Sequence, residues 1–167
     1  MAKSLLRTDK EIAEIYERHV NMVYRIGFAY MKNVAETEDV VQEAFYKLIK
    51  SGTDFESLEH EKAWLIRTAS NICKNTLRHW WRKRENLEDY EKLQDNKVFE
   101  VDDTLSAVMN LPDKYKTVIY LYYYESYNSV EISKILQKKQ STIRNHLHEA
   151  RKILKEKLNE GGDFDEE

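Results

Sequence analysis

Apolar residues recur every three or four positions along most of this 167-residue chain, and such spacing predicts amphipathic helices. The first stretch covers residues 12–30, and Asn33 with Glu36 can cap a second helix. Ser51-Gly52-Thr53 breaks that helix, and a third begins near Glu59. We therefore expect three helices that share one apolar interior.

A second group of apolar periods predicts four further helices. Thr104 can cap a short one, and Pro112 suits the first turn of the next. Asn128 or Ser129 caps a third, which ends at Leu136, and a longer helix follows after a short polar turn. Because the chain has only four Gly and one Pro, it offers few tight turns, which favours helices over strands.

The sequence therefore predicts an all-α protein of two small helical domains, with a helix-turn-helix in the second. The segment between them is acidic and has no sustained apolar period, so we expect a flexible linker there. The expected boundaries are 8–86 for the first domain, 87–103 for the linker, 104–160 for the second domain and 161–167 for an acidic tail.

Charged residues are sorted into blocks that the net charge of −3 conceals. Residues 67–84 carry six Lys and Arg and no acid, and residues 132–158 carry eight against two acids. Between them, residues 85–103 carry eight acids against two lysines. Two basic helical stretches joined by an acidic segment indicate a protein that binds a polyanion at two places.

Several kinds of chemistry lack their motifs. Four scattered glycines cannot form a phosphate-binding loop, and there is no HExxH. The single cysteine, Cys73, lies on an apolar helix face, where we expect it in the core. No apolar run is long enough to cross a membrane, and the N-terminus has no signal-peptide pattern. We expect a cytoplasmic protein with no membrane insertion, no cofactor, no metal and no enzymatic activity.

The last two predicted helices have the spacing of a helix-turn-helix, because about four residues separate residues 128–136 from residues 141–158. The apolar stripe leaves four residues on outer faces, where they could reach base edges and phosphates, namely Arg144, Asn145, His148 and Arg151. An ordinary helical hairpin with solvated charges would have the same spacing and stays an alternative.

One ordered set of motifs runs through both predicted domains. In order and spacing it resembles the bacterial sigma factors of the extracytoplasmic-function (ECF) group, over about residues 8–158. The motifs are Asp39-Val40-Val41-Gln42-Glu43-Ala44-Phe45, Lys62-Ala63-Trp64-Leu65, Arg67-Thr68-Ala69-Ser70-Asn71, Leu111-Pro112, Glu131-Ile132, Thr142-Ile143 and Ala150-Arg151.

The resemblance implies a transcription initiation factor that keeps the sigma domains numbered two and four. Such a protein would bind core RNA polymerase, at the clamp helices of the largest subunit and at the flap, and would direct it to promoters. Asp39, Gln42 and Glu43 match the polymerase-binding positions. An exposed acidic helix face would explain their charge but not their place in the ordered set. An anti-sigma factor is a further expected partner.

The resemblance also implies two DNA contacts, with single strand at the −10 element and double strand at the −35 element. Phe55 and Asn71 would border a pocket for an unstacked −10 base, although Phe55 could instead anchor its loop as a core aromatic. The implied −10 residues are Phe55, Arg67, Asn71, Lys74, Arg78 and Arg82, and the implied −35 residues are Ser141, Thr142, Arg144, Asn145, His148 and Arg151.

The turn of the helix-turn-helix departs from the family pattern. Relatives usually place glycine near Gln137 and again near Ser141. Either Gln137 adopts a strained left-handed conformation or the turn has another shape.

Two other functions remain alternatives to a sigma factor. A helix-turn-helix regulator that acts without stable polymerase association would bind a palindromic site as a dimer. A helical adaptor would use its basic faces to bind acidic proteins. The regulator leaves residues 39–45 without a role.

Overall fold

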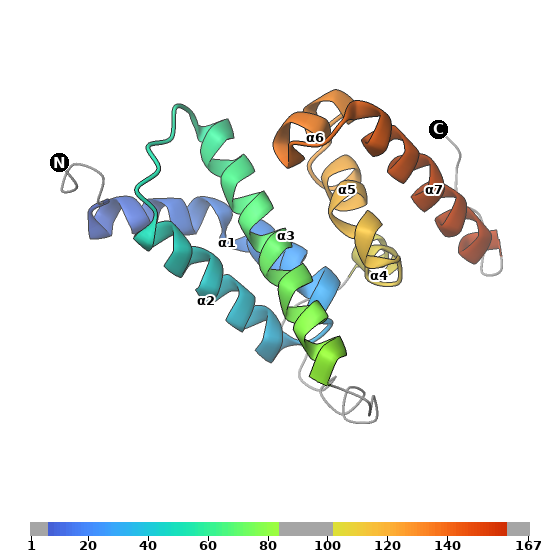
Figure 1. Cartoon of the computed structure of the whole chain (residues 1–167), viewed down its shortest axis with the longest axis horizontal. Helices are drawn as coiled ribbons and strands as arrows, with labels where there is room; N and C mark the ends of the chain where they lie inside the picture. The colour runs from blue at the N-terminus through green and yellow to red at the C-terminus, as the bar shows by residue number, and fades with distance from the viewer. Residues whose placement is uncertain (1–6, 84–101, 160–167) are drawn as a thin grey trace. The chain divides into compact units, whose positions relative to one another are not determined.

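The computed structural model describes residues 7–83 and 102–159 and forms two compact units, Met1–Glu100 and Val101–Glu167 (Figure 1). Within the described residues every regular element is an α-helix, which confirms the predicted all-α class. Most of the predicted linker 87–103 and all of the predicted tail 161–167 lie outside the described residues.

The first unit contains α1 (Asp9–Met31), α2 (Val34–Lys50) and α3 (Leu58–Lys83), close to the three predicted helices. The connection from α1 to α2 is very short. Lys32 ends α1 in a left-handed conformation with φ of 66°, and its N–H donates to the carbonyl oxygen of Phe28. Asn33 then caps α2, as predicted, because its Oδ1 accepts from the N–H of Glu36 at 2.8 Å.

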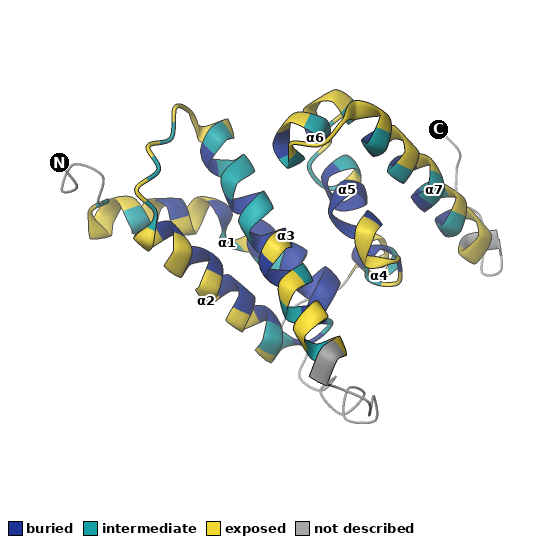
Figure 2. Cartoon of the chain, viewed as in Figure 1, coloured by how far each residue is buried: buried dark blue, intermediate teal, exposed yellow. Residues whose placement is uncertain are grey.

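The apolar faces of α1, α2 and α3 turn toward one another. Figure 2 shows buried residues along the facing sides of these helices and exposed residues on the outer sides. At Gly27 the approach of α1 to α2 is so close that a Cβ atom would lie 3.2 Å from Cγ2 of Thr37. Cys73 is fully buried in this core, as expected.

One polar cluster is buried between α1 and α3. Glu61 is 6% exposed, and its carboxylate accepts from Nε and Nη2 of Arg18 at 3.0–3.2 Å. His19 Nε2 lies 2.7 Å from Oε1 of the same carboxylate. Because a buried carboxylate is costly without partners, these contacts fix the start of α3 against α1.

The second unit contains α4 (Asp103–Met109), α5 (Asp113–Tyr123), α6 (Ser129–Leu136) and α7 (Gln140–Asn159). The predicted cap at Thr104 is wrong. Asp102 caps α4 instead, because its Oδ1 accepts from the N–H of Leu105 at 2.7 Å, and the hydroxyl of Tyr124 donates to its other carboxylate oxygen. A carboxylate also suits the positive end of the helix dipole better than a hydroxyl.

The starts of α5 and α6 can also be compared with the prediction. Pro112 stands one residue before α5 rather than inside its first turn. Of the two candidate caps for α6, Asn128 is the residue used, in a capping box with Glu131. The core between the helices draws on all four of them, and its most buried side chains include Leu105, Ile119, Leu121, Ile132, Ile143 and Ala150.

Candidate functional site

The outer face of α2 carries the three residues expected to bind polymerase. Asp39, Gln42 and Glu43 are all exposed, because α2 buries its opposite side against α1 and α3. Tyr46 lies one turn after Gln42 on the same face and is 57% exposed. The sequence analysis did not include Tyr46, although its spacing of four residues from Gln42 places it there.

The basic face of α3 carries four of the residues expected at the −10 element. Arg67, Asn71, Lys74 and Arg78 follow one another at intervals of four, three and four residues, so they share one side of the helix. Asn71 and Arg78 are exposed, whereas Arg67 and Lys74 are half-buried. Burial lowers the pKa of Arg67 from its usual value, without taking away its positive charge. The side chain of Arg82 lies outside the described residues.

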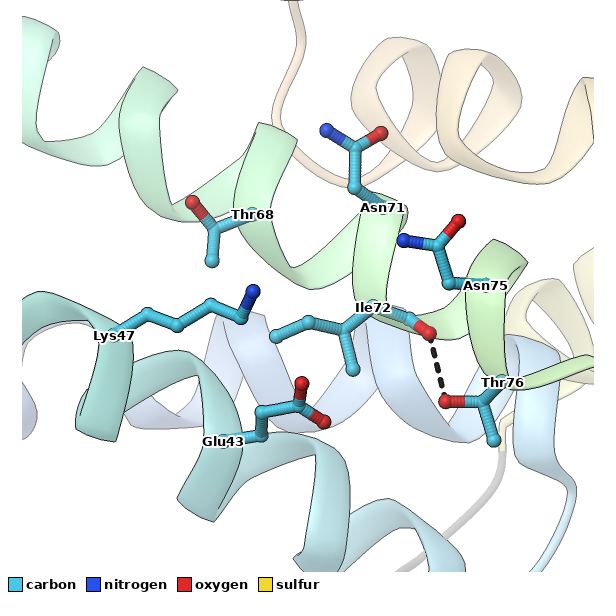
Figure 3. Close-up of a pocket in the computed structure, with 7 residues that line it drawn as sticks. All are labelled: Glu43, Lys47, Thr68, Asn71, Ile72, Asn75 and Thr76. Carbon is cyan, nitrogen blue, oxygen red and sulfur yellow. Dashed lines mark hydrogen bonds between the residues drawn. The ribbon is translucent and has the colours of Figure 1, made fainter. Parts of the chain in front are cut away.

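A hollow of about 180 Å³ lies between α2 and α3 (Figure 3). It connects the outer face of α2 with the basic face of α3. Glu43 and Lys47 extend into it from α2, while the side chains of Thr68, Asn71 and Asn75 come from α3. Together these groups offer a cation, a carboxylate, two amides and a hydroxyl, which can donate and accept hydrogen bonds.

Five residues that line this hollow are not among the predicted site residues, namely Lys47, Thr68, Ile72, Asn75 and Thr76. Lys47 follows Glu43 by four residues, and Thr68 and Asn75 stand three before and four after Asn71. Helical spacing from the predicted residues would have found each of them. That they face one hollow is a property of how α2 packs on α3.

Phe55 lies apart from this hollow's lining, on the loop between α2 and α3. Its half-buried ring packs edge-on with His60 and with Trp64, at centroid distances of 5.3 and 5.9 Å. Asn71 lies seven residues beyond Trp64, which is about 10 Å along the same side of α3. Phe55 therefore has the packing expected of a loop anchor, and part of its surface stays accessible.

The turn between α6 and α7 has only three residues. Of the two alternatives that the sequence left open, Gln137 adopts the strained left-handed conformation. Its backbone is left-handed, with φ of 56° and ψ of 45°. The N–H groups of Gln137 and Lys138 both donate to the carbonyl oxygen of Ser133, the latter at 3.0 Å. The Lys138 bond is the 6→1 bond of a Schellman motif and the Gln137 bond is that of an αL motif, and both motifs normally have glycine at the left-handed position.

The outer face of α7 presents four of the six residues expected at the −35 element. These are Ser141, Arg144, Asn145 and His148, all exposed at the spacing of one helix face. Thr142 is half-buried. Arg151 is also half-buried, and its guanidinium lies over the ring of Tyr122 in α5, 4.4 Å from the centroid.

In 7–83 and 102–159, no group of His, Cys, Asp or Glu is arranged to hold a metal ion. No helix in these two ranges has both the length and the apolarity needed to cross a membrane.

Known proteins match this chain over both units. Residues 15–84 match the family Sigma-70 region 2, and residues 102–154 match Sigma-70, region 4. The ECF RNA polymerase sigma factor SigM of Bacillus subtilis is 30% identical, over 90% of this chain and 96% of SigM. The chain belongs to the ECF sigma factors. This sigma factor is a transcription initiation factor, which directs RNA polymerase to promoters.

Two further relatives agree with this family. The ECF RNA polymerase sigma factor SigW of Bacillus subtilis is 26% identical, over 93% of this chain and 94% of SigW. Among solved structures, the sigma factor RpoE of Bartonella quintana, in complex with the anti-sigma factor NepR, matches with a TM-score of 0.67 and 18% identity. This match covers 90% of this chain and 98% of that one, and it supports the fold.

Proposed function

We propose that this sigma factor divides promoter recognition between its two units. In the first, α2 binds core polymerase and α3 holds the single-stranded −10 element. In the second, α7 reads the duplex −35 element. The observation that carries this proposal is that α2, α3 and α7 each present exposed polar side chains along one face, within the segments that match Sigma-70 regions 2 and 4.

The contact with polymerase is proposed at Asp39, Gln42 and Glu43. Their side chains are solvated in the free protein and would lose water in a complex with the clamp helices. Charged groups that become desolvated and paired at an interface fix its register and its partner. The flap is proposed as a second polymerase contact, made by the second unit.

The −35 contact is proposed at the first turns of α7, which follow directly after the helix-turn-helix turn. A helix of this kind fits the major groove, where its N-terminal residues reach base edges. Arg144 and His148 are exposed one turn apart and are proposed to read bases, and the half-buried Arg151 is proposed to contact the phosphate backbone. The exposed amide of Asn145 can both donate and accept.

The −10 contact is proposed on the side of α3 between Phe55 and Asn71. Melting the promoter needs a base to leave the stack, which costs a few kcal/mol unless the protein compensates. An aromatic ring contributes about 1–3 kcal/mol per stacked base. Phe55 supplies such a ring, and the Asn71 amide can bond a base edge. Lys74 and Arg78 lie further along the same face, where they can follow the strand's phosphates.

The overall proposal is tested by transcription with purified core polymerase on a mapped promoter. We expect promoter-specific transcripts only when this sigma factor is added. Binding of a palindromic site by a dimer of the chain alone, with no effect on polymerase, would instead identify a conventional regulator.

The −10 proposal is tested by permanganate footprinting of the same complexes. Phe55→Ala and Asn71→Ala should each impair promoter opening much more than binding to polymerase or formation of the closed complex. Asn21→Ala is a matched control, because Asn21 is an exposed asparagine on α1, far from α3's basic face in the sequence. Normal thymine reactivity near −10 in both Phe55 and Asn71 variants would contradict base capture.

We also propose the setting in which the protein works. It acts in the cytoplasm, and it has no catalytic activity, because polymerase supplies the chemistry. An anti-sigma factor is proposed to restrain it. This proposal is supported by the related Bartonella sigma factor, which was solved in complex with one.

A further inference from the structure

Arg7 stands before α1, yet it contacts a loop more than forty residues away in the sequence. Its Nη1 donates to the carbonyl oxygens of Leu48 and Ser51, both at 3.3 Å, and its Nη2 donates to that of Thr53. The same guanidinium lies over the ring of Phe55, with Cζ 4.6 Å from the centroid. One side chain therefore joins the start of the chain to the end of α2 and to the loop that follows.

The local structure on both sides favours this contact. A capping box fixes the backbone next to Arg7, because Glu11 N–H donates to Thr8 Oγ1 at 3.1 Å and Thr8 N–H donates to the Glu11 carboxylate at 3.3 Å. At the other side, the last carbonyl oxygens of a helix lack partners within it and carry partial negative charge. A guanidinium, which is flat and has five donors, suits several such oxygens at once.

The rest of the loop is held by local bonds. Ser51 Oγ donates to Thr53 Oγ1 at 2.7 Å, and Glu56 N–H donates to His60 Nδ1 at 3.1 Å. These bonds join residues two and four positions apart, so they shape short segments without fixing the loop to α1. Arg7 adds that fixed point, and it does so beside the aromatic ring on which the proposed base would stack.

We propose that Arg7 is a positioning residue for promoter opening. By bonding the loop and covering one side of Phe55, it holds the ring in place before DNA arrives, so that little loop order is lost when a base binds. This inference rests on the proposed function of Phe55. The match to Sigma-70 region 2 begins at residue 15, so Arg7 lies outside the matched segment.

The first experiment compares Arg7→Ala and Arg7→Lys in the full-length protein bound to core polymerase. Arg7→Ala should lower promoter opening about tenfold, the effect of losing about 1.4 kcal/mol of preorganisation. Arg7→Lys should restore it only in part, since an ammonium cannot stack flat and bond three carbonyls together. Lys10→Ala is the matched control, because Lys10 is an exposed cation three residues further on, and it should behave as wild type.

Three readouts should not change in the Arg7 variants. Binding to core polymerase and binding to −35 duplex should equal wild type, because neither uses the loop. The salt dependence of opening should also stay the same. A slope smaller by about one would mean that Arg7 itself contacts a phosphate, which would overturn the positioning role.

The decisive experiment is a double-mutant cycle with Phe55→Ala. If Arg7 acts through Phe55, Arg7→Ala should have little further effect on opening once the ring is gone. An equal loss with and without the ring would overturn the inference. Impaired opening in Phe55→Ala together with normal opening in Arg7→Ala would overturn the inference alone, whereas normal opening in Phe55→Ala would overturn the proposed base contact as well. Should Arg7→Ala fail to fold, the same cycle is run with Arg7→Lys.

Discussion

In the second unit the candidate DNA-reading residues lie on one helix, whereas in the first they lie on α3 and the loop before it, and their surroundings include α2 and Arg7. Arg144 and His148 are placed by the geometry of α7 alone, with 1.5 Å of rise per residue. Phe55 is placed by Arg7 and by α3, and the hollow beside Asn71 exists only because α2 packs there.

This difference predicts how far the effect of a substitution extends to neighbouring residues. A substitution on the outer face of α7 should change only the contact that its side chain makes. A substitution around Phe55 should act through its neighbours and give non-additive effects. Each prediction below tests one side of this comparison.

Charge reversal on α2 should have the largest effect, because it should prevent the first unit from binding core polymerase, its proposed partner. Asp39→Arg combined with Glu43→Arg should abolish co-purification with core polymerase while leaving the helical content unchanged by circular dichroism. Losing one desolvated charged contact can cost about 2–5 kcal/mol. Full polymerase binding by this variant would contradict the assignment of α2.

A matched control for that variant is available on α1. Glu14 and Glu17 are exposed acids, so Glu14→Arg combined with Glu17→Arg makes the same change in net charge elsewhere. It should bind polymerase normally. Loss of binding in both double variants would mean that net charge matters rather than the face of α2.

Replacing the proposed base reader on α7 should have the next largest effect. Arg144→Ala should relax the sequence preference at the −35 element by about 1–3 kcal/mol at one base position. Lys152→Ala, an exposed cation two turns further along α7, should leave the preference unchanged. Binding to a set of single-base promoter variants measures both. If Arg144→Ala discriminates as well as wild type, Arg144 does not read that base.

The helices themselves were within reach of sequence reasoning. Apolar spacing found all the helices of the described residues to within a few positions, because burial of one stripe fixes each of them. The sequence also placed Cys73 in the core and Asn33 at the N-terminal cap of α2. At Gln137 the sequence posed the right alternative but could not choose, since the choice depends on whether α6 and α7 can pack with only three residues between them.

The details that depend on distant contacts were out of reach. Asp102 was preferred to Thr104 as a cap partly because Tyr124 bonds it from α5. Arg7 lies outside every apolar period, and nothing in its neighbours indicates a loop more than forty residues away. Spacing in the sequence thus predicts well which residues share a helix face. It predicts poorly which residues make contact where two elements pack together.

Replacing Arg151 should have two smaller effects, because Arg151 stacks on Tyr122 and is also proposed to contact a phosphate. Arg151→Ala should lower the free energy of unfolding of the second unit by about 1 kcal/mol, the size of a partly buried cation–π contact. It should also weaken binding to all −35 sequences and reduce the salt slope. Tyr122→Leu should lower stability and leave the salt slope unchanged. An unaltered salt slope in Arg151→Ala would remove Arg151 from the phosphate contacts.

The smallest effect is expected at the C-terminal end of α6, where the backbone is left-handed. The same conformation ends a helix in the other unit, so the two units can be compared directly. Both units end a helix with a left-handed residue other than glycine, namely Lys32 after α1 and Gln137 after α6. A left-handed backbone costs a residue with a Cβ atom about 1–2 kcal/mol. Glycine avoids this cost but loses about 0.5–1 kcal/mol through its freedom in the unfolded chain. Gln137→Gly should therefore raise the stability of the second unit by about 0.5 kcal/mol.

Thermal unfolding of matched variants checks this balance of strain and chain entropy. Lys138→Gly is the control, because Lys138 is an exposed neighbour without a positive φ, so glycine there should only destabilise. Lys32→Gly should stabilise the first unit for the same reason that Gln137→Gly stabilises the second. If Gln137→Gly lowers the melting temperature as Lys138→Gly does, the side chain of Gln137 contributes more than its backbone strain costs. The departure from the family's glycine would then be a gain in stability for this helix-turn-helix.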